Sequence, residues 1–423
     1  MPATDPPPDV TDVRRAVEAV FRIESARLIA GLARLVRDVG LAEELAQDAL
    51  VIALEQWPAR GVPDEPGPWL MATAKHRAID LLRRQENYRR KLAVLGRDAE
   101  IAVDDLDGVD DLLDDHIGDD LLRLIFTACH PVLSTESQVA LTLRMLGGLT
   151  TEEIARAFLI SEATASQRIL RAKRTLARQR VRFELPTPAD MADRLAATLG
   201  TIYLIFNEGY SATAGDDWAR PQLCEEATRL GRVLAGLLPG AAEVHGLSAL
   251  MELQASRMPA RTGPDGRPVL LLEQDRRRWD RLLIRRGLEA LGRAEALGTL
   301  GPYGLQAAIA ACHARAGRAE ATDWGRIAAL YRLLAQVAPS AVVELNRAVA
   351  VGMADGAEAG LAIVDGLRAQ GVLGAYPHLP AVRGDLLARL GRDEEARAEF
   401  AAAAALTRNE SERELFERRA GPV

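Results

Sequence analysis

Apolar residues in this chain recur with the period of an α-helix. Between residues 42 and 57 they follow the spacing i, i+3, i+4, i+7, and a similar spacing returns between residues 165 and 176. Runs of β-branched and aromatic residues, which favour strands, are nearly absent. The pattern therefore predicts an all-α fold. No apolar run approaches the roughly 18 residues that a membrane span needs, so we expect no membrane partner.

The helical pattern is most informative at residues 149–180. Thr150 or Thr151 can cap a short first helix, and Ser161 can cap a second helix after a tight turn. The second helix has an apolar stripe formed by Ala165, Ile169, Ala172 and Leu176. Caps, turn and stripe together predict a helix-turn-helix. The alternative is an ordinary amphipathic helix with a solvated basic face.

The other face of this second helix leads into a basic tail. Seven Arg or Lys and no acidic residue lie between Ala163 and Phe183. Arg and Lys hold phosphates, and Arg, Gln and Thr also reach base edges in the major groove of DNA. The predicted DNA contacts are Thr164, Gln167, Arg168, Arg171, Arg174 and Arg178. We expect Arg174 and Arg178 to hold phosphates.

Charge and helix-breaking residues divide the chain into five segments. Eleven Asp or Glu from Asp98 to Asp120 mark an acidic linker, and Pro186 and Pro188 interrupt the helical pattern after the basic tail. The predicted segments are a disordered tail at 1–10, a first helical unit at 11–91, the acidic linker at 92–120, a second helical unit at 121–183 and a long helical section at 190–423.

The first helical unit contains two helices of opposite charge. In the helix at 42–57, Glu43, Glu44, Gln47 and Asp48 line the face opposite the apolar stripe. That stripe is formed by Ala42, Leu45, Ala46, Ala49, Leu50, Ala53, Leu54 and Trp57. The next helix begins near Pro68. Its predicted outward-facing residues are Lys75, His76, Arg77, Arg83 and Arg84. An acidic face followed by a basic one indicates two different partners.

The net charge of −7 changes this interpretation, because a DNA-binding protein that acts alone is usually basic. We therefore expect weak DNA binding by the free chain, or docking on a partner that supplies affinity. The three Cys form no CxxC pair, and Cys129 next to His130 is poor geometry for two ligands of one metal. The sequence predicts no disulfide framework, metal site or cofactor, and a reducing cytoplasm is the simplest setting.

The order of these segments resembles the sigma-70 family of RNA polymerase sigma factors. The resemblance rests on AEELAQDALVIALEQWP, then PWLMATAKHRAIDLLRR, a linker, and a helix-turn-helix ending in QRILRAKRTLAR. More narrowly, the chain resembles the extracytoplasmic-function group, which keeps only sigma regions 2 and 4. One subgroup has a long C-terminal extension, and the motifs at 203–212, 274–281, 301–314, 322–324 and 345–351 resemble it.

This resemblance implies a protein that binds core RNA polymerase and directs promoter-specific transcription initiation. Region 2 is expected to bind a coiled coil on the largest core subunit through Glu44, Gln47 and Asp48. The implied contacts of region 2 with the −10 promoter element are Trp69, Lys75, His76, Arg77, Arg83 and Arg84. Region 4 is expected to bind the −35 element and the flap region of polymerase. Two alternatives stay open. Trp69 can instead be a core residue. The acidic linker can either mimic nucleic acid in the polymerase channel or act as a solvated tether.

The last section also resembles tetratricopeptide (TPR) helix pairs. Residues 380–406 match one pair, with packing positions at Gly384, Leu387, Ala396, Phe400 and Ala403. An earlier segment matches the same pattern less closely, with Ala359 and Ile363 at the corresponding packing positions. TPR-like repeats are therefore expected over residues 340–410. Stacked helix pairs present a concave surface for peptides or partner domains. We expect a protein or peptide partner there, and a section that modulates the activity of the first two units.

Two other functions compete with the sigma factor. One is a stand-alone helix-turn-helix regulator with a ligand- or peptide-sensing solenoid. The other is an enzyme that uses Glu208, His313 or Asp323. The sequence shows no nucleophile–base spacing, metal cluster or Gly-rich phosphate loop, so it predicts no enzyme. The polar residues of the C-terminal motifs fit either buried networks between helices or a binding pocket.

Overall fold

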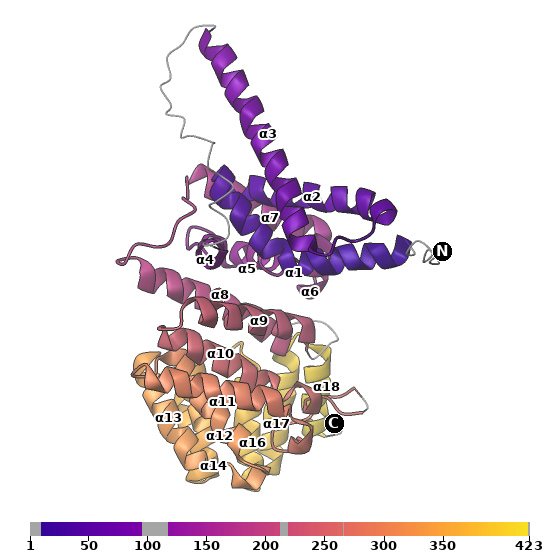
Figure 1. Cartoon of the computed structure of the whole chain (residues 1–423). Helices are drawn as coiled ribbons and strands as arrows, with labels where there is room; N and C mark the ends of the chain where they lie inside the picture. The colour runs from indigo at the N-terminus through magenta and orange to yellow at the C-terminus, as the bar shows by residue number, and fades with distance from the viewer. Residues whose placement is uncertain (1–9, 95–116, 212–218, 265, 422–423) are drawn as a thin grey trace. The chain divides into compact units, whose positions relative to one another are not determined.

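A computed structural model describes residues 10–94, 117–211, 219–264 and 266–421. Helices make up most of these residues, and no strand of a sheet occurs among them (Figure 1), which confirms the all-α fold. The chain divides into two compact units, Met1–Thr201 and Ile202–Val423. Within the described ranges, no helix is both long and apolar enough to span a bilayer.

The first unit is built around its first helix. Its helices are α1 (Val10–Val36), α2 (Val39–Arg60), α3 (Pro66–Val94), α4 (Ile117–Ala128), α5 (Thr135–Met145), α6 (Thr151–Ala157), α7 (Glu162–Arg178) and the first part of α8 (Met191–Tyr210). Helix α1 packs against α2 and α3, and also against α4, while α5 and α6 support α7. Helix α1 therefore joins the two predicted helical units. The second half of α3 extends beyond the other helices of this unit (Figure 1).

Both ends of the predicted acidic linker, residues 92–94 and 117–120, lie inside helices. Helix α3 continues to Val94, and residues 95–116 lie outside the described part of the chain, as does the predicted tail up to residue 9. Asp120, assigned to the acidic linker, is 2% exposed in α4. Its carboxylate pairs with Arg123 at 2.6 Å and with Arg34 of α1 at 3.3 Å. Asp120 thus anchors α4 to α1 and is not a solvated linker residue.

The second unit is a series of helices in which each packs against the next. The helices are α9 (Pro221–Leu237), α10 (Ala242–Ala255), α11 (Arg281–Ala296), α12 (Pro302–Arg315), α13 (Trp324–Val337), α14 (Ala341–Ala354), α15 (Ala357–Ala369), α16 (His378–Arg389), α17 (Asp393–Leu406) and α18 (Glu410–Ala420). Three short 3₁₀ turns also occur: η1 (Met258–Ala260), η2 (Arg276–Arg278) and η3 (Ala319–Ala321). Such chains of consecutive helix contacts suit a solenoid.

Small residues let the helices of the second unit approach closely. The predicted packing positions in α16 and α17 are buried, and a Cβ atom at Gly384 would lie 2.9 Å from the ring of Phe400. In α15 the packing positions are shifted by one residue from those predicted at Ala359 and Ile363, because Gly360 and Val364 are buried whereas Ala359 is exposed. A Cβ atom at Gly360 would lie 2.6 Å from the carbonyl oxygen of Ala348 in α14. Only glycine permits this contact, which fixes the register of the α14–α15 pair.

Candidate functional site

Helices α6 and α7 form the predicted helix-turn-helix, and both predicted caps are confirmed. The Thr150 hydroxyl accepts a hydrogen bond from the Glu153 N–H at 3.1 Å, and the Glu153 carboxylate accepts one from the Thr150 N–H at 2.8 Å. The Ser161 hydroxyl accepts from the Thr164 N–H at 3.1 Å. In the turn between the helices, Leu159 takes the left-handed conformation with φ of 49°. Local side-chain hydrogen bonds therefore define where each helix starts.

The two faces of α7 differ as the sequence predicts. Ala165, Ile169, Ala172 and Leu176 are all buried, which fixes the side of α7 that packs inward. On the other side, Gln167, Arg171, Arg174 and Arg178 are exposed, while Thr164 and Arg168 are half-buried. Within the described ranges, no carboxylate pairs with Arg171, Arg174 or Arg178, and these guanidinium groups are available for an anion such as a phosphate.

Helix α2 carries the predicted acidic face next to the predicted basic one. Glu44 and Asp48 are exposed and Gln47 is half-buried. Asp48 accepts a hydrogen bond from Arg77 of α3 at 2.6 Å, and both side chains are about half exposed. A surface ion pair of this kind contributes at most about 1 kcal/mol, so either partner is easily recruited by another molecule.

Three orientations predicted in α2 and α3 are wrong. Lys75 is only 9% exposed, because its position between the buried Ala74 and Ala78 turns it to the apolar side of α3. Glu43 is 4% exposed and does not belong to the outer acidic face. Leu54, placed in the apolar stripe, is 38% exposed.

The remaining residues predicted to contact the −10 element lie on α3. His76, Arg77, Arg83 and Arg84 are exposed. Trp69 is half-buried, and the edge of its ring meets the buried Trp57 with the ring centroids 5.4 Å apart. This packing supports the interpretation of Trp69 as a core residue.

Two segments of the first unit match known families. Residues 21–88 match the model of sigma-70 region 2, and residues 123–176 match that of sigma-70 region 4. The chain belongs to the sigma-70 family. Region 2 thus covers α2 and most of α1 and α3, and region 4 covers the second half of α4, all of α5 and α6 and most of α7. The two regions make this protein a sigma factor or a sigma-like DNA-binding regulator.

Other comparisons extend the similarity into the second unit. Residues 194–295 match a family of unknown function, DUF6596. An uncharacterized protein of Rhizobium meliloti (strain 1021) is 46% identical over 387 residues, which cover 90% of this chain and 89% of that protein. No solved structure matches the chain. The similarity to the Rhizobium protein therefore includes both compact units of the sigma-70 family member.

A buried ion-pair cluster at Glu43 joins region 2 to region 4. The Glu43 carboxylate accepts hydrogen bonds from Arg144 of α5 at 2.8 Å and from Gln47 at 2.9 Å, and it pairs with Lys173 of α7. Arg144 also donates to the carbonyl oxygen of Leu149 at 3.0 Å, just before α6. We call Glu43, Arg144 and Lys173 the Glu43 cluster. It ties α2 of region 2 to two helices of region 4.

The polar motifs of the second unit mostly connect its helices. Glu208 pairs with Arg220, and the Asp323 carboxylate caps α13 by accepting from the Arg326 N–H at 2.9 Å. The buried Arg276 donates to the carbonyl oxygen of His313 at 2.7 Å. Two further bonds from Arg276 reach the Ala316 carbonyl oxygen and the Thr322 hydroxyl. These contacts support the structural interpretation of the motifs.

The sequence did not indicate Glu243, which has a comparable role. Its carboxylate accepts from the N–H groups of Tyr303 and Gly304 at 2.9 and 3.0 Å, at the start of α12. Carboxylates stabilise helix N-termini in this way. Because Glu243 lies about 60 residues from its partners, no local pattern reveals the contact. Among the described residues, no three His, Cys, Asp or Glu side chains come close enough to hold a metal ion.

His313 is neutral in the folded protein. Its ring is 9% exposed and meets the ring of Trp324 edge-on, with centroids 5.2 Å apart. Burial, reinforced by the guanidinium groups of Arg257 and Arg276, lowers the pKa of His313 to about 3. Protonation of His313 is therefore opposed by the fold at any pH near neutrality.

Replacing Glu43 tests the energetic weight of the Glu43 cluster. Glu43→Gln keeps the shape of the side chain but leaves Arg144 and Lys173 without their buried counter-charge. We expect the free energy of unfolding to fall by about 3 kcal/mol, measured by urea denaturation. The matched control is Glu44→Gln on the exposed side of α2, which should change stability by less than about 0.5 kcal/mol. Equal decreases in the free energy of unfolding for the two variants would show that the Glu43 cluster stabilises the fold no more than an exposed carboxylate does.

His313 predicts a pH dependence of stability. Between about pH 3 and 6.5 the unfolded chain binds one more proton at this position than the folded chain does. The free energy of unfolding should therefore decrease by about 1.4 kcal/mol for each pH unit below about 6.5 on account of His313. In His313→Gln this component of the slope between about pH 6.5 and 5 should vanish in denaturation curves. A slope in His313→Gln equal to that of the natural chain would contradict the assignment.

Proposed function

We propose that this protein is an extracytoplasmic-function sigma factor, which binds core RNA polymerase and directs promoter-specific transcription initiation. The observation that carries the proposal is the presence of sigma regions 2 and 4 in one chain, with a basic face on α7 whose exposed arginines form no ion pair among the described residues. Only residues 89–122 separate the two matches, and they include the end of α3 and the start of α4. That interval is too short for another domain, which favours this group.

Region 4 is proposed to bind the −35 element through α7. An α-helix fits the major groove, and the exposed face of α7 has Gln167 and Arg171 nearer its start and Arg174 and Arg178 further along. Gln and Arg are suited to adenine and guanine edges, and the later arginines to phosphates. Thr164 and Arg168 flank this face and are half-buried, so we assign them a minor part. The flap of polymerase is the proposed protein partner of region 4.

Region 2 is proposed to bind both polymerase and the −10 element. Glu44 and Asp48, with Gln47 beside them, offer a negative surface to a basic coiled coil on the largest core subunit, where complementary charge sets the rate and register of docking. His76, Arg77, Arg83 and Arg84 offer positive charge to the strands of the −10 element. Lys75 is not part of the proposed surface, because it is buried.

The second unit is proposed to be a TPR-like domain that modulates the sigma regions. The pairs α14–α15 and α16–α17 pack through glycines, as in stacked helical repeats. A mainly apolar groove of 510 Å³ lies in this unit, lined among others by Trp324, Met353 and Leu386. A groove of this character suits a protein or peptide partner.

Two variants separate the proposed functions of the first unit. Arg171→Ala with Arg174→Ala should leave binding to core polymerase intact and weaken −35 recognition, by roughly tenfold or more for each lost contact. Glu44→Lys should weaken core binding and leave the α7 surface intact. The measurements are co-purification with core polymerase and transcription from a promoter selected with the natural protein. Tight operator binding by the free chain, with no affinity for core polymerase, would favour the stand-alone regulator instead.

Truncation tests the modulating role of the second unit. The cut should follow Thr201, because Arg194 donates to the Phe126 carbonyl oxygen at 2.7 Å and Thr201 to Gln138 at 3.3 Å within the first unit. We expect the shortened protein to recognise the same promoter and to produce a changed amount of transcript in a reconstituted assay. Identical transcript levels from the shortened and full chains, over a range of protein concentrations, would contradict the proposed modulation.

A further inference from the structure

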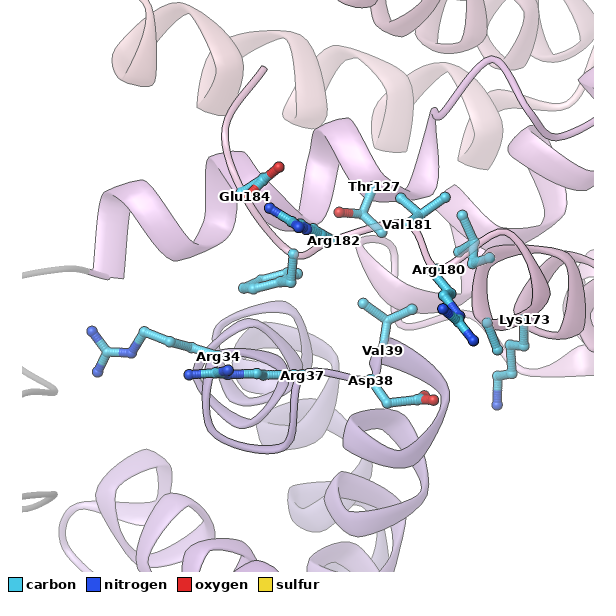
Figure 2. A pocket seen from close by; sticks show the side chains of 13 residues that line it. Arg34, Arg37, Asp38, Val39, Thr127, Lys173, Arg180, Val181, Arg182 and Glu184 are labelled. Atoms are coloured by element: carbon cyan, nitrogen blue, oxygen red, sulfur yellow. The ribbon is translucent and has the colours of Figure 1, made fainter. Parts of the chain in front are cut away.

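A pocket of 760 Å³ lies in the first unit where the turn between α1 and α2 meets the end of α7 (Figure 2). In this view Arg34 and Arg37 extend from the end of α1 on one side, and Lys173 and Arg180 lie on the other. The pocket therefore has one wall from region 2 and one wall from region 4 and the segment after it. Its volume is that of a small-molecule site.

The pocket collects positive charge in a chain whose net charge is −7. Five basic residues line it, against the two carboxylates of Asp38 and Glu184. Asp38 already caps α2, accepting from the Leu41 N–H at 2.9 Å. The basic residues are Arg34, Arg37, Lys173, Arg180 and Arg182.

Two of these five cations have a carboxylate partner, and for the other three the described residues provide none. Lys173 pairs with Glu43, and Arg34 with Asp120. Within the ranges that the structure describes, Arg37, Arg180 and Arg182 form no ion pair or side-chain hydrogen bond. Three guanidinium groups around one hollow repel one another, and an anion bound there would remove that repulsion.

The backbone at two of these arginines is unusual. Arg37 has φ of 55° and Arg180 has φ of 50°, which is the left-handed conformation. They follow the ends of α1 and α7, where glycine is the favoured residue and a side chain costs about 1 kcal/mol. Both places carry a long cationic side chain instead, and both line the same pocket. Backbone strain of this kind is concentrated at binding sites.

The pocket lies on a different side of α7 from the proposed DNA-reading face. With 3.6 residues per turn, the pocket-lining Lys173 and Ala177 point about 110° away from the centre of the exposed set Gln167, Arg171, Arg174 and Arg178, and Arg180 follows the end of the helix. A duplex that α7 reads through the second set would lie to one side of the pocket. The geometry thus favours a small ligand over the promoter.

We propose that this pocket binds a phosphorylated small molecule of nucleotide size. Arg37, Arg180 and Arg182 supply forked donors for phosphate oxygens. The half-buried ring of Phe183 also lines the pocket and offers an apolar surface to the rest of the ligand. Because its two walls belong to regions 2 and 4, the bound ligand stabilises the same arrangement as the Glu43 cluster. This consequence for transcription rests on the proposed function, whereas the binding itself does not.

Calorimetric titration of the full chain tests the proposal without polymerase or promoter. The probes are inorganic tripolyphosphate, ATP and a short single-stranded oligonucleotide. We expect saturable binding of tripolyphosphate and ATP at one site. Arg37→Gln with Arg180→Gln should weaken this binding about tenfold or more for each arginine removed. Arg182→Gln is a second variant. Arg182 lies outside the helices and has no left-handed backbone, so this substitution removes a charge without altering the strained positions Arg37 and Arg180.

Arg60→Gln with Arg156→Gln is the matched control, because both arginines are exposed in the first unit and neither lines the pocket; it should leave the affinity for tripolyphosphate and ATP unchanged. Thermal melts followed by circular dichroism verify that each variant is folded. The proposal fails if neither tripolyphosphate nor ATP binds, or if the pocket variants bind them as well as the natural chain does. It also fails if only the oligonucleotide binds and the pocket variants lose it, because the surface would then be part of a nucleic-acid path.

Discussion

The carboxylate of Glu43 holds regions 2 and 4 of the first unit in one arrangement. A buried negative charge is tolerated only with close positive partners, and Arg144 and Lys173 provide them from two helices of region 4. Since Lys173 must face α2 to reach Glu43, the rotation of α7 about its axis is fixed. Gln167, Arg171 and Arg174 then point to solvent. The buried stripe of α7 and this ion-pair cluster together fix which side of the helix-turn-helix faces solvent.

The same cluster holds together two regions that the proposed function needs apart. The −10 and −35 elements are about 25 base pairs from one another, or roughly 85 Å along the duplex. A compact unit of 201 residues has a radius of gyration of only about 16 Å. By this estimate, a unit with the Glu43 cluster closed is small compared with the separation of the two elements that it is proposed to contact. A buried ion pair suits a contact that must open. Much of its attraction is offset by the cost of desolvating the charges, and the charged groups regain their hydration when they separate.

The helix-turn-helix could be predicted in detail because its determinants are local. The caps at Thr150 and Ser161 and the buried stripe of α7 each depend on residues within four positions of one another. The burial of Glu43 could not be predicted, since its partner Arg144 lies 101 residues away. At the edge of an apolar stripe, sequence spacing alone does not distinguish a solvated carboxylate from a paired one. The displaced register in α15 has a similar cause, because the contact between Gly360 and Ala348 is tertiary.

Opening of the Glu43 cluster would change the charges of both regions in the direction that the proposed function requires. While it is closed, Glu43 neutralises part of the positive charge of Lys173 and Arg144. Separation would leave region 4 with two uncompensated cations and region 2 with an additional exposed carboxylate one residue from Glu44. Region 4 would then be attracted more strongly to DNA, and α2 to a basic surface on polymerase. An acidic chain can therefore gain affinity for DNA from the rearrangement itself, with no change in its composition.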